Sequence, residues 1–122
     1  MTKNYSIDTL GGVTTVRFSE EPIMNVIRNA IDDVAENYLS ELRLWDLSSE
    51  GINLTSTQIG EVAQYEKSKF LIPSKIAVVA SKDLAFGLMR MYQVFREDEL
   101  AEVNIFRTER EARAWLKEQP GQ

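Results

Sequence analysis

The chain has 122 residues, about the length of one ordinary domain, and it carries 43% hydrophobic and 27% charged residues. This composition is typical of a globular protein, and we expect a single domain over residues 1–122. With 19 acidic residues against 14 basic ones, the net charge is −5, which argues against nucleic-acid binding because phosphate contacts need Lys and Arg.

The absent residue types exclude several kinds of chemistry. The sequence has no Cys, so disulfides, thiolate zinc sites, Fe–S clusters and cysteine catalysis are excluded. It also has no His, which excludes Ser-His-Asp catalysis and removes the usual general base at neutral pH. We therefore expect no catalytic residue, no metal and no cofactor, and we predict that the chain is not an enzyme.

No segment of the sequence predicts a membrane span or a targeting signal. The longest apolar run, Ile76–Ala80, has five residues, whereas a transmembrane helix needs about 20. The N-terminal segment lacks the apolar centre of a signal peptide. We expect a cytoplasmic protein without a membrane span.

The first half of the chain predicts a β-hairpin, a helix and a strand. Residues 5–10 and 13–18 have the β-branched, alternating character of strands, and the two glycines between them favour a tight turn. Apolar residues then recur every three or four positions over about residues 21–37, which indicates an amphipathic helix. Residues 43–47 are predicted to form a central strand.

The second half alternates between helices and strands. A helix is predicted to begin at residue 55 or 56 and to end before Pro73. The apolar run at residues 75–80 is typical of a parallel strand that is covered on both faces. A third helix, a last strand at residues 103–106 and a final helix follow.

Four positions carry hydroxyl side chains that favour a helix start. These candidate N-caps are Ser19, Thr55 or Ser56, Ser81 and Thr108. A hydroxyl at the N-cap accepts a hydrogen bond from a backbone N–H of the first turn. Glu111 follows Thr108 at the spacing of a capping box.

The order of elements predicts the fold class. After the hairpin, strands and helices alternate strictly, which indicates an α/β fold with right-handed crossovers. We expect a single-domain, five-stranded mixed sheet with an opening β-hairpin and four helices. The first strand should lie at an edge and run antiparallel to its neighbour, and helices should cover both faces.

Candidate site residues lie in loops that follow the predicted parallel strands. Ligands of open α/β sheets favour the crevice beyond the carboxyl ends of the strands. Asp46, Ser48, Ser81 and Asp83 lie at that edge, and each loop leads into a helix N-terminus, which favours anions. The alternative is that these side chains only cap helices and close turns.

The start of the second helix offers two hydroxyls, Thr55 and Ser56. A phosphate on either would place about two negative charges at the positive end of the helix dipole, which is a favourable position. Both residues are therefore candidate phospho-acceptors. The alternative is that they serve only as caps.

The third helix is apolar over more than one side. Its main predicted core stripe consists of Leu84, Leu88, Met91, Tyr92 and Phe95. A helix that is apolar over so wide an arc is either buried or meets a partner. We therefore interpret this helix as a candidate ligand or interface element, and the residues concerned are Phe86, Met89, Arg90, Met91 and Tyr92.

Three stretches together resemble a known family. They are Leu44–Leu47, Ile76–Tyr92, which contains F-G-x-x-R-M-Y, and Val103–Leu116, which contains F-R-x-x-x-x-A-x-x-W-L. In these motifs the chain resembles the SpoIIAA-like group of bacterial domains, which are related in fold to STAS domains and are compared with CRAL-TRIO lipid-binding domains. The resemblance covers most of the chain.

The resemblance implies two functions. STAS anti-sigma-factor antagonists carry D-S-S-G at the start of the second helix, where a partner kinase phosphorylates a serine and switches binding. The matching region here is Asn53–Thr57, with Leu54 in place of the Asp and no Gly after the hydroxyls. We therefore expect a regulatory or protein-interaction domain, with a homodimer or another protein as partner. The alternative is a module that binds a small apolar ligand or lipid between the sheet and the third helix.

Overall fold

A computed structural model describes residues 4–118 and contains five strands and four helices. In chain order they are β1 (Tyr5–Leu10), β2 (Val13–Phe18), α1 (Met24–Asn37), β3 (Leu42–Asp46), α2 (Ser56–Lys69), β4 (Ser74–Val79), α3 (Asp83–Arg96), β5 (Ala101–Phe106) and α4 (Glu109–Leu116).

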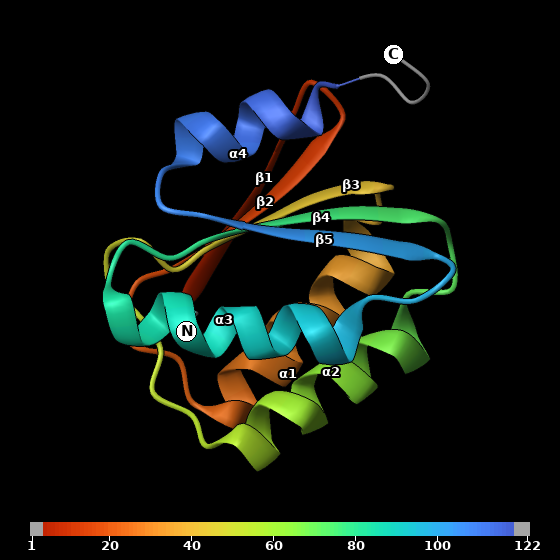
Figure 1. Cartoon of the computed structure of the whole chain (residues 1–122). Coiled ribbons are helices and arrows are strands. Elements are labelled where there is room, and N and C mark those ends of the chain that lie inside the picture. Colours follow the sequence, from red (N-terminus) through yellow and green to blue (C-terminus); the bar gives the residue numbers. More distant parts are fainter. Residues whose placement is uncertain (1–3, 119–122) are drawn as a thin grey trace.

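The strands form one mixed sheet in the order β1-β2-β3-β4-β5 (Figure 1). β1 pairs with β2 antiparallel, and every other pair of neighbours is parallel. Gly11 and Gly12 have φ angles of 61° and 80°, which only glycine adopts without strain, and they allow the two-residue hairpin turn. The predicted fold class, including the antiparallel edge strand, is confirmed.

The helices divide unequally between the two faces of the sheet. α1, α2 and α3 cover one face and α4 alone lies on the other (Figure 1). Each crossover from β2 to β5 is right-handed and steps in the same direction along the sheet, so the three connecting helices must share a face. α4 follows the last strand and is free of this constraint. Helices on both faces are therefore confirmed, in a ratio that the sequence did not indicate.

Two of the predicted caps are wrong. α1 begins only at Met24 and its N-cap is Ile23, without a side-chain bond, because the Ser19 backbone N–H instead extends the hairpin by donating to the Asn4 carbonyl. The N-cap of α3 is Lys82. The Ser81 hydroxyl lies one residue too early and donates to the Arg107 carbonyl at 2.9 Å.

The two threonine caps are confirmed. Thr55 Oγ1 accepts from the Gln58 backbone N–H at 3.1 Å, and the Gln58 side chain accepts from the Thr55 N–H at 2.9 Å, which completes a capping box. Thr108 Oγ1 accepts from the Glu111 N–H at 3.3 Å. The Thr108 hydroxyl donates to the Glu111 carboxylate at 2.9 Å, so the second half of that box is made through the side chain.

The predicted stripe of α3 is only partly right: Tyr92 is buried, and Leu88 and Met91 are half-buried against the main core. The residues of α3 that are buried are Ala85, Met89, Tyr92 and Arg96. Leu84 is 62% exposed and Phe95 is 43% exposed. The buried face is turned by about a quarter of the helix circumference from the apolar stripe, and it contains an arginine, so hydropathy alone did not find it.

Candidate functional site

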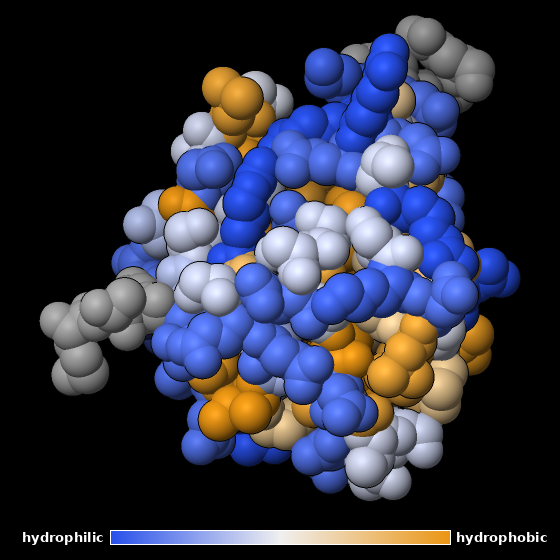
Figure 2. All heavy atoms as spheres, turned by 90° about the vertical axis from the view of Figure 1, so that its left-hand side faces the viewer, coloured by the Kyte–Doolittle hydropathy of each residue, from blue (hydrophilic) through white to orange (hydrophobic). Residues whose placement is uncertain are grey.

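The loops after β3, β4 and β5 meet at one edge of the sheet, as predicted, because these strands are parallel. Figure 2 faces this carboxyl edge, where hydrophilic side chains dominate the upper half and apolar ones gather mainly in the lower half, on the side of α1–α3. The Ser81 hydroxyl bonds to the Arg107 carbonyl, and Arg107 in turn donates to the Asp83 carboxylate at 2.8 Å. The second and third loops are therefore tied together.

Asp46 and Ser48 form a closed local turn. The Asp46 carboxylate accepts from the Ser48 backbone N–H at 2.9 Å and also from the Ser48 hydroxyl. The Arg17 Nε atom lies 3.7 Å from the same carboxylate. These contacts give the Asp46 carboxylate a structural role, and they link β3 to β2 at the carboxyl edge.

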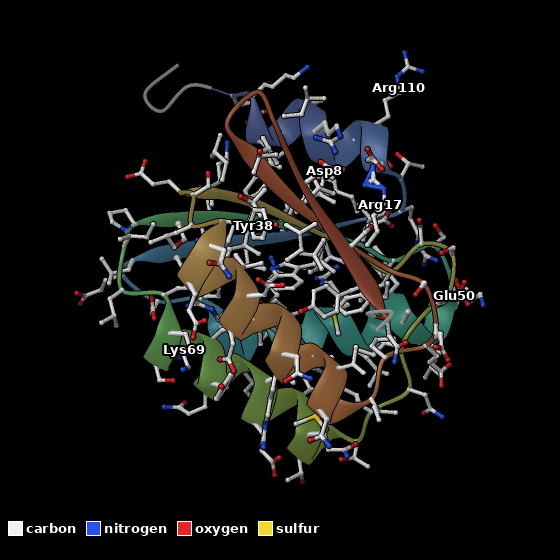
Figure 3. All side chains as sticks on the ribbon, turned by 180° about the vertical axis from the view of Figure 1, so that it is seen from behind. Asp8, Arg17, Tyr38, Glu50, Lys69 and Arg110 are labelled. Atoms are coloured by element: carbon white, nitrogen blue, oxygen red, sulfur yellow. The ribbon has the colours of Figure 1, made fainter. Side chains whose placement is uncertain are left out.

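Arg17 also connects the edge to α4. Its NH2 group contacts both carboxylate oxygens of Glu109, at 2.9 and 3.0 Å, and Arg113 donates to Glu109 at 2.7 Å. The hydrogen bond from Arg113 is the main cause that holds the pKa of Glu109 below its usual range, and the charge of Arg17 adds to it. Figure 3 shows Arg17 beneath α4, on the side where Arg110 is labelled. The sequence-based search for a site missed this group.

The two candidate phospho-acceptors differ in their contacts. The Thr55 hydroxyl is held in the capping box. Ser56 is the first residue of α2 and is exposed, and its hydroxyl makes no hydrogen bond to any residue within 4–118. The first turn of α2 carries no acidic residue, so nothing in that turn repels an anion at Ser56.

The candidate residues of α3 point in different directions. Met89 and Tyr92 are buried in the main core. Arg90 is exposed, whereas Phe86 and Met91 are half-buried, with the Arg107 guanidinium 4.1 Å from the centre of the Phe86 ring. They therefore do not form a single surface.

A small cavity lies between the sheet and the α1–α3 layer. Its volume is about 40 Å³ and its walls are mainly apolar, with Trp45, Leu54 and Met89 among the lining residues. Glu66 and Tyr92 also line it. This volume holds one or a few water molecules, whereas pockets for drug-sized ligands measure roughly 300–1,000 Å³.

Four polar side chains near this cavity form a buried polar cluster, Arg43, Glu66, Tyr92 and Arg96. Arg96 Nε lies 3.8 Å from Glu66 Oε2. Arg43 donates to the Ser40 carbonyl at 2.7 Å and to the Ser74 hydroxyl at 2.9 Å. Glu66 Oε2 and the Tyr92 hydroxyl have no hydrogen-bond partner within the described part of the chain.

Burial decides how the groups of this cluster titrate. It raises the pKa of Glu66 above its usual range, against the opposing charge of Arg96. Burial, together with the charge of Glu66, raises the pKa of Tyr92 well above its usual value. It also lowers the pKa of Arg43. The sequence alone did not reveal this cluster, although Glu66 occupies the same helical stripe as Ile59 and Val62.

Among residues 4–118, no group of three or more acidic side chains is arranged to hold a metal ion. No helix in that range is both long and apolar enough to cross a membrane. No protein-family model matches the sequence, and comparison with curated proteins finds no significant match. The resemblance to SpoIIAA-like domains therefore stays a prediction.

Proposed function

We propose that this chain is a non-enzymatic regulatory domain of the SpoIIAA-like, STAS-related type, which docks a protein partner on α3. The observation that carries the proposal is an exposed apolar stripe on that helix. It consists of Leu84, Leu88, Met91 and Phe95, spaced by four, three and four residues; Leu84 is 62% and Phe95 43% exposed, whereas Leu88 and Met91 are half-buried against the main core. An ordered apolar row that the core leaves half uncovered is typical of a helix that meets another protein.

The position of this row of four residues, called the α3 stripe below, supports the proposal. Gln93 and Phe86, on the opposite side of the helix, reach the Val103 carbonyl in β5 and the Arg107 side chain after it. The α3 stripe therefore lies on the side of α3 toward the neighbouring helix α2, with its two ends, Leu84 and Phe95, exposed. Packed helices run about 8–10 Å apart, and both helices begin at the carboxyl edge of the sheet. A partner seated on the α3 stripe would come close to Ser56.

Ser56 gives the surface a means of regulation. Its hydroxyl is exposed and unbonded within the described chain, at the first position of a 14-residue helix. A phosphate there would gain from the free N–H groups and the helix dipole. The added charge would then oppose an apolar contact on the α3 stripe. Thr55 is the weaker acceptor, because its oxygen already caps α2.

The size of this cavity weakens the alternative function, binding of a lipid or small apolar ligand, as far as the space between the sheet and α3 is concerned. A space of about 40 Å³ is far below the volume of ordinary ligand pockets. A lipid tail would require α1–α3 to move away from the sheet. The interaction surface needs no such rearrangement.

The docking surface is tested by site-specific photo-crosslinking in the cell from which the protein comes. A crosslinking residue at Leu84 should give one discrete adduct, which Phe95→Glu removes. A crosslinker at Arg110, on α4, is the matched control and should give none. Equal adducts from both positions, or none from Leu84, would refute the docking surface.

Phosphorylation is tested separately by mass spectrometry of the intact protein from the same cells. We expect a fraction heavier by one phosphate, lost in Ser56→Ala and kept in Thr57→Ala. If the protein carries no phosphate in any growth condition, regulation by phosphorylation is refuted, and the proposed docking surface is unaffected.

A further inference from the structure

The two edges of the sheet differ in how their backbone groups are satisfied. On β5, the outward N–H of Val103 donates to Glu97 at 3.1 Å and its carbonyl accepts from Gln93 at 2.7 Å. The Ile105 N–H donates to the Asn104 side chain at 3.0 Å. Side chains thus occupy this edge, which is a known means of preventing further strand addition.

The β1 edge has no such protection at its centre. The bond from the Ser19 N–H to the Asn4 carbonyl sets the alternation of the antiparallel ladder. With the register of β1 against β2, it follows that Ile7 and Thr9 direct their N–H and C=O groups away from the sheet. No hydrogen bond from the part of the chain that the structure describes reaches these groups. Figure 3 views the molecule from this side, with Asp8 labelled on β1 and no further strand in front.

We propose that the β1 edge pairs antiparallel with β1 of a second copy of this chain, with Ile7 opposite Ile7 at a twofold axis. This would join two sheets into one continuous sheet across a symmetric interface. The inference is independent of the α3 stripe, which lies on another part of the molecule.

Side-chain pairing disfavours an axis at position 8 and favours one at Ile7. Antiparallel pairing must bring outward-facing residues together, so the twofold axis falls at position 6, 7 or 8. An axis at position 8 sets two Asp8 carboxylates directly opposite each other, which is destabilising. An axis at Ile7 sets each Ser6 hydroxyl opposite the Asp8 carboxylate of the other copy, twice by symmetry. Ser6 and Asp8 are both exposed on the same face of β1, so the pair can form without disturbing the core.

Sedimentation of the full chain tests the proposal with a pair of exchanged side chains. The unaltered chain should dimerise. Ser6→Asp should weaken the dimer at least tenfold, about 1.4 kcal/mol, because it sets a carboxylate opposite Asp8. Adding Asp8→Ser to that variant should restore the dimer, because the carboxylate and hydroxyl are then merely exchanged. Both positions are exposed, so circular dichroism should show unchanged folding.

Three outcomes would overturn the proposal. A monomer at every concentration up to about 1 mM would exclude the interface. A dimer equally strong in the unaltered chain, Ser6→Asp and the double variant would exclude the register. A dimer that Leu84→Glu abolishes and Ser6→Asp leaves intact would place the interface on the α3 stripe instead.

Discussion

The two faces of the sheet bury very different sets of side chains. Beneath α1–α3 the core contains large apolar side chains, the small cavity and the buried polar cluster. Beneath α4 the buried apolar residues are fewer and smaller: Val13, Leu44, Ala77, Val79, Ala112 and Leu116. Three helices can enclose an ion pair completely, whereas the single short helix α4 leaves the larger side chains on its face, Phe106 and Trp115, only partly buried. The charged side chains are therefore buried beneath α1–α3 because three helices cover that face, whereas one covers the other.

The largest loss of stability is expected from a substitution on the sheet face that α1–α3 cover, called the three-helix face below. Arg96→Ala should lower the free energy of unfolding by about 3–5 kcal/mol, because it leaves Glu66 buried without its nearest cation. Denaturant unfolding measures this. Arg107→Ala is the matched control, since its ion pair with Asp83 is exposed, and it should cost less than about 1 kcal/mol.

A double variant sharpens this prediction. Glu66→Gln combined with Arg96→Met should recover part of the loss, because neither charge of the pair is then buried. A cost equal to that of Arg96→Ala would mean that packing volume, and not charge, dominates this face.

The face beneath α4 should respond less to truncation. Leu116→Ala should cost about 2–3 kcal/mol, near the lower end for buried leucines, because α4 can settle onto the sheet. Ile31→Ala on the three-helix face should cost about 4 kcal/mol, because the surrounding layer cannot close around the cavity. A larger loss from Leu116→Ala than from Ile31→Ala would contradict this reading of the two faces.

The two faces should also differ in the sign of their pH dependence. Glu66 has its pKa raised by burial, so its contribution to stability is present below the unfolded pKa and is lost as pH rises through the folded one. Glu109 has its pKa lowered, chiefly by Arg113, so its contribution is present at neutral pH and is lost as pH falls. Relative to the unaltered chain, Glu66→Gln should therefore become more stable as pH rises. The deficit of Glu109→Gln should shrink in acid. Unfolding curves across pH would contradict this if both variants followed the unaltered chain.

The smallest effects come from the two threonine caps. Thr55→Ala and Thr108→Ala should each cost about 1 kcal/mol. Hydrogen exchange should distinguish them, because loss of the Thr108 cap should open the eight-residue α4 locally, while α2 stays protected by its neighbours until global unfolding. Thr57→Ala, at an exposed position in the first turn of α2, is the control and should change neither measurement.

The candidate site could be predicted only in part. Spacing of hydroxyls located Thr55 and Thr108 as caps, and strand order located the shared edge of the loops. Direction of the α3 side chains could not be predicted, because Arg96 on the buried face and Leu84 on the exposed face reverse the usual hydropathy rule. The buried polar cluster was equally hidden, since Arg43, Glu66 and Arg96 are far apart in the chain and read singly as surface residues.

Alternation of short apolar strands with amphipathic segments was enough to determine the α/β class, the opening hairpin and the strand count, because these depend on local periodicity and turn residues. Only the tertiary structure decided which face each helix covers, which side of α3 is buried, and which charges share the core. Those depend on the handedness of the crossovers and on contacts between segments that are distant in sequence, and no local pattern encodes either of them.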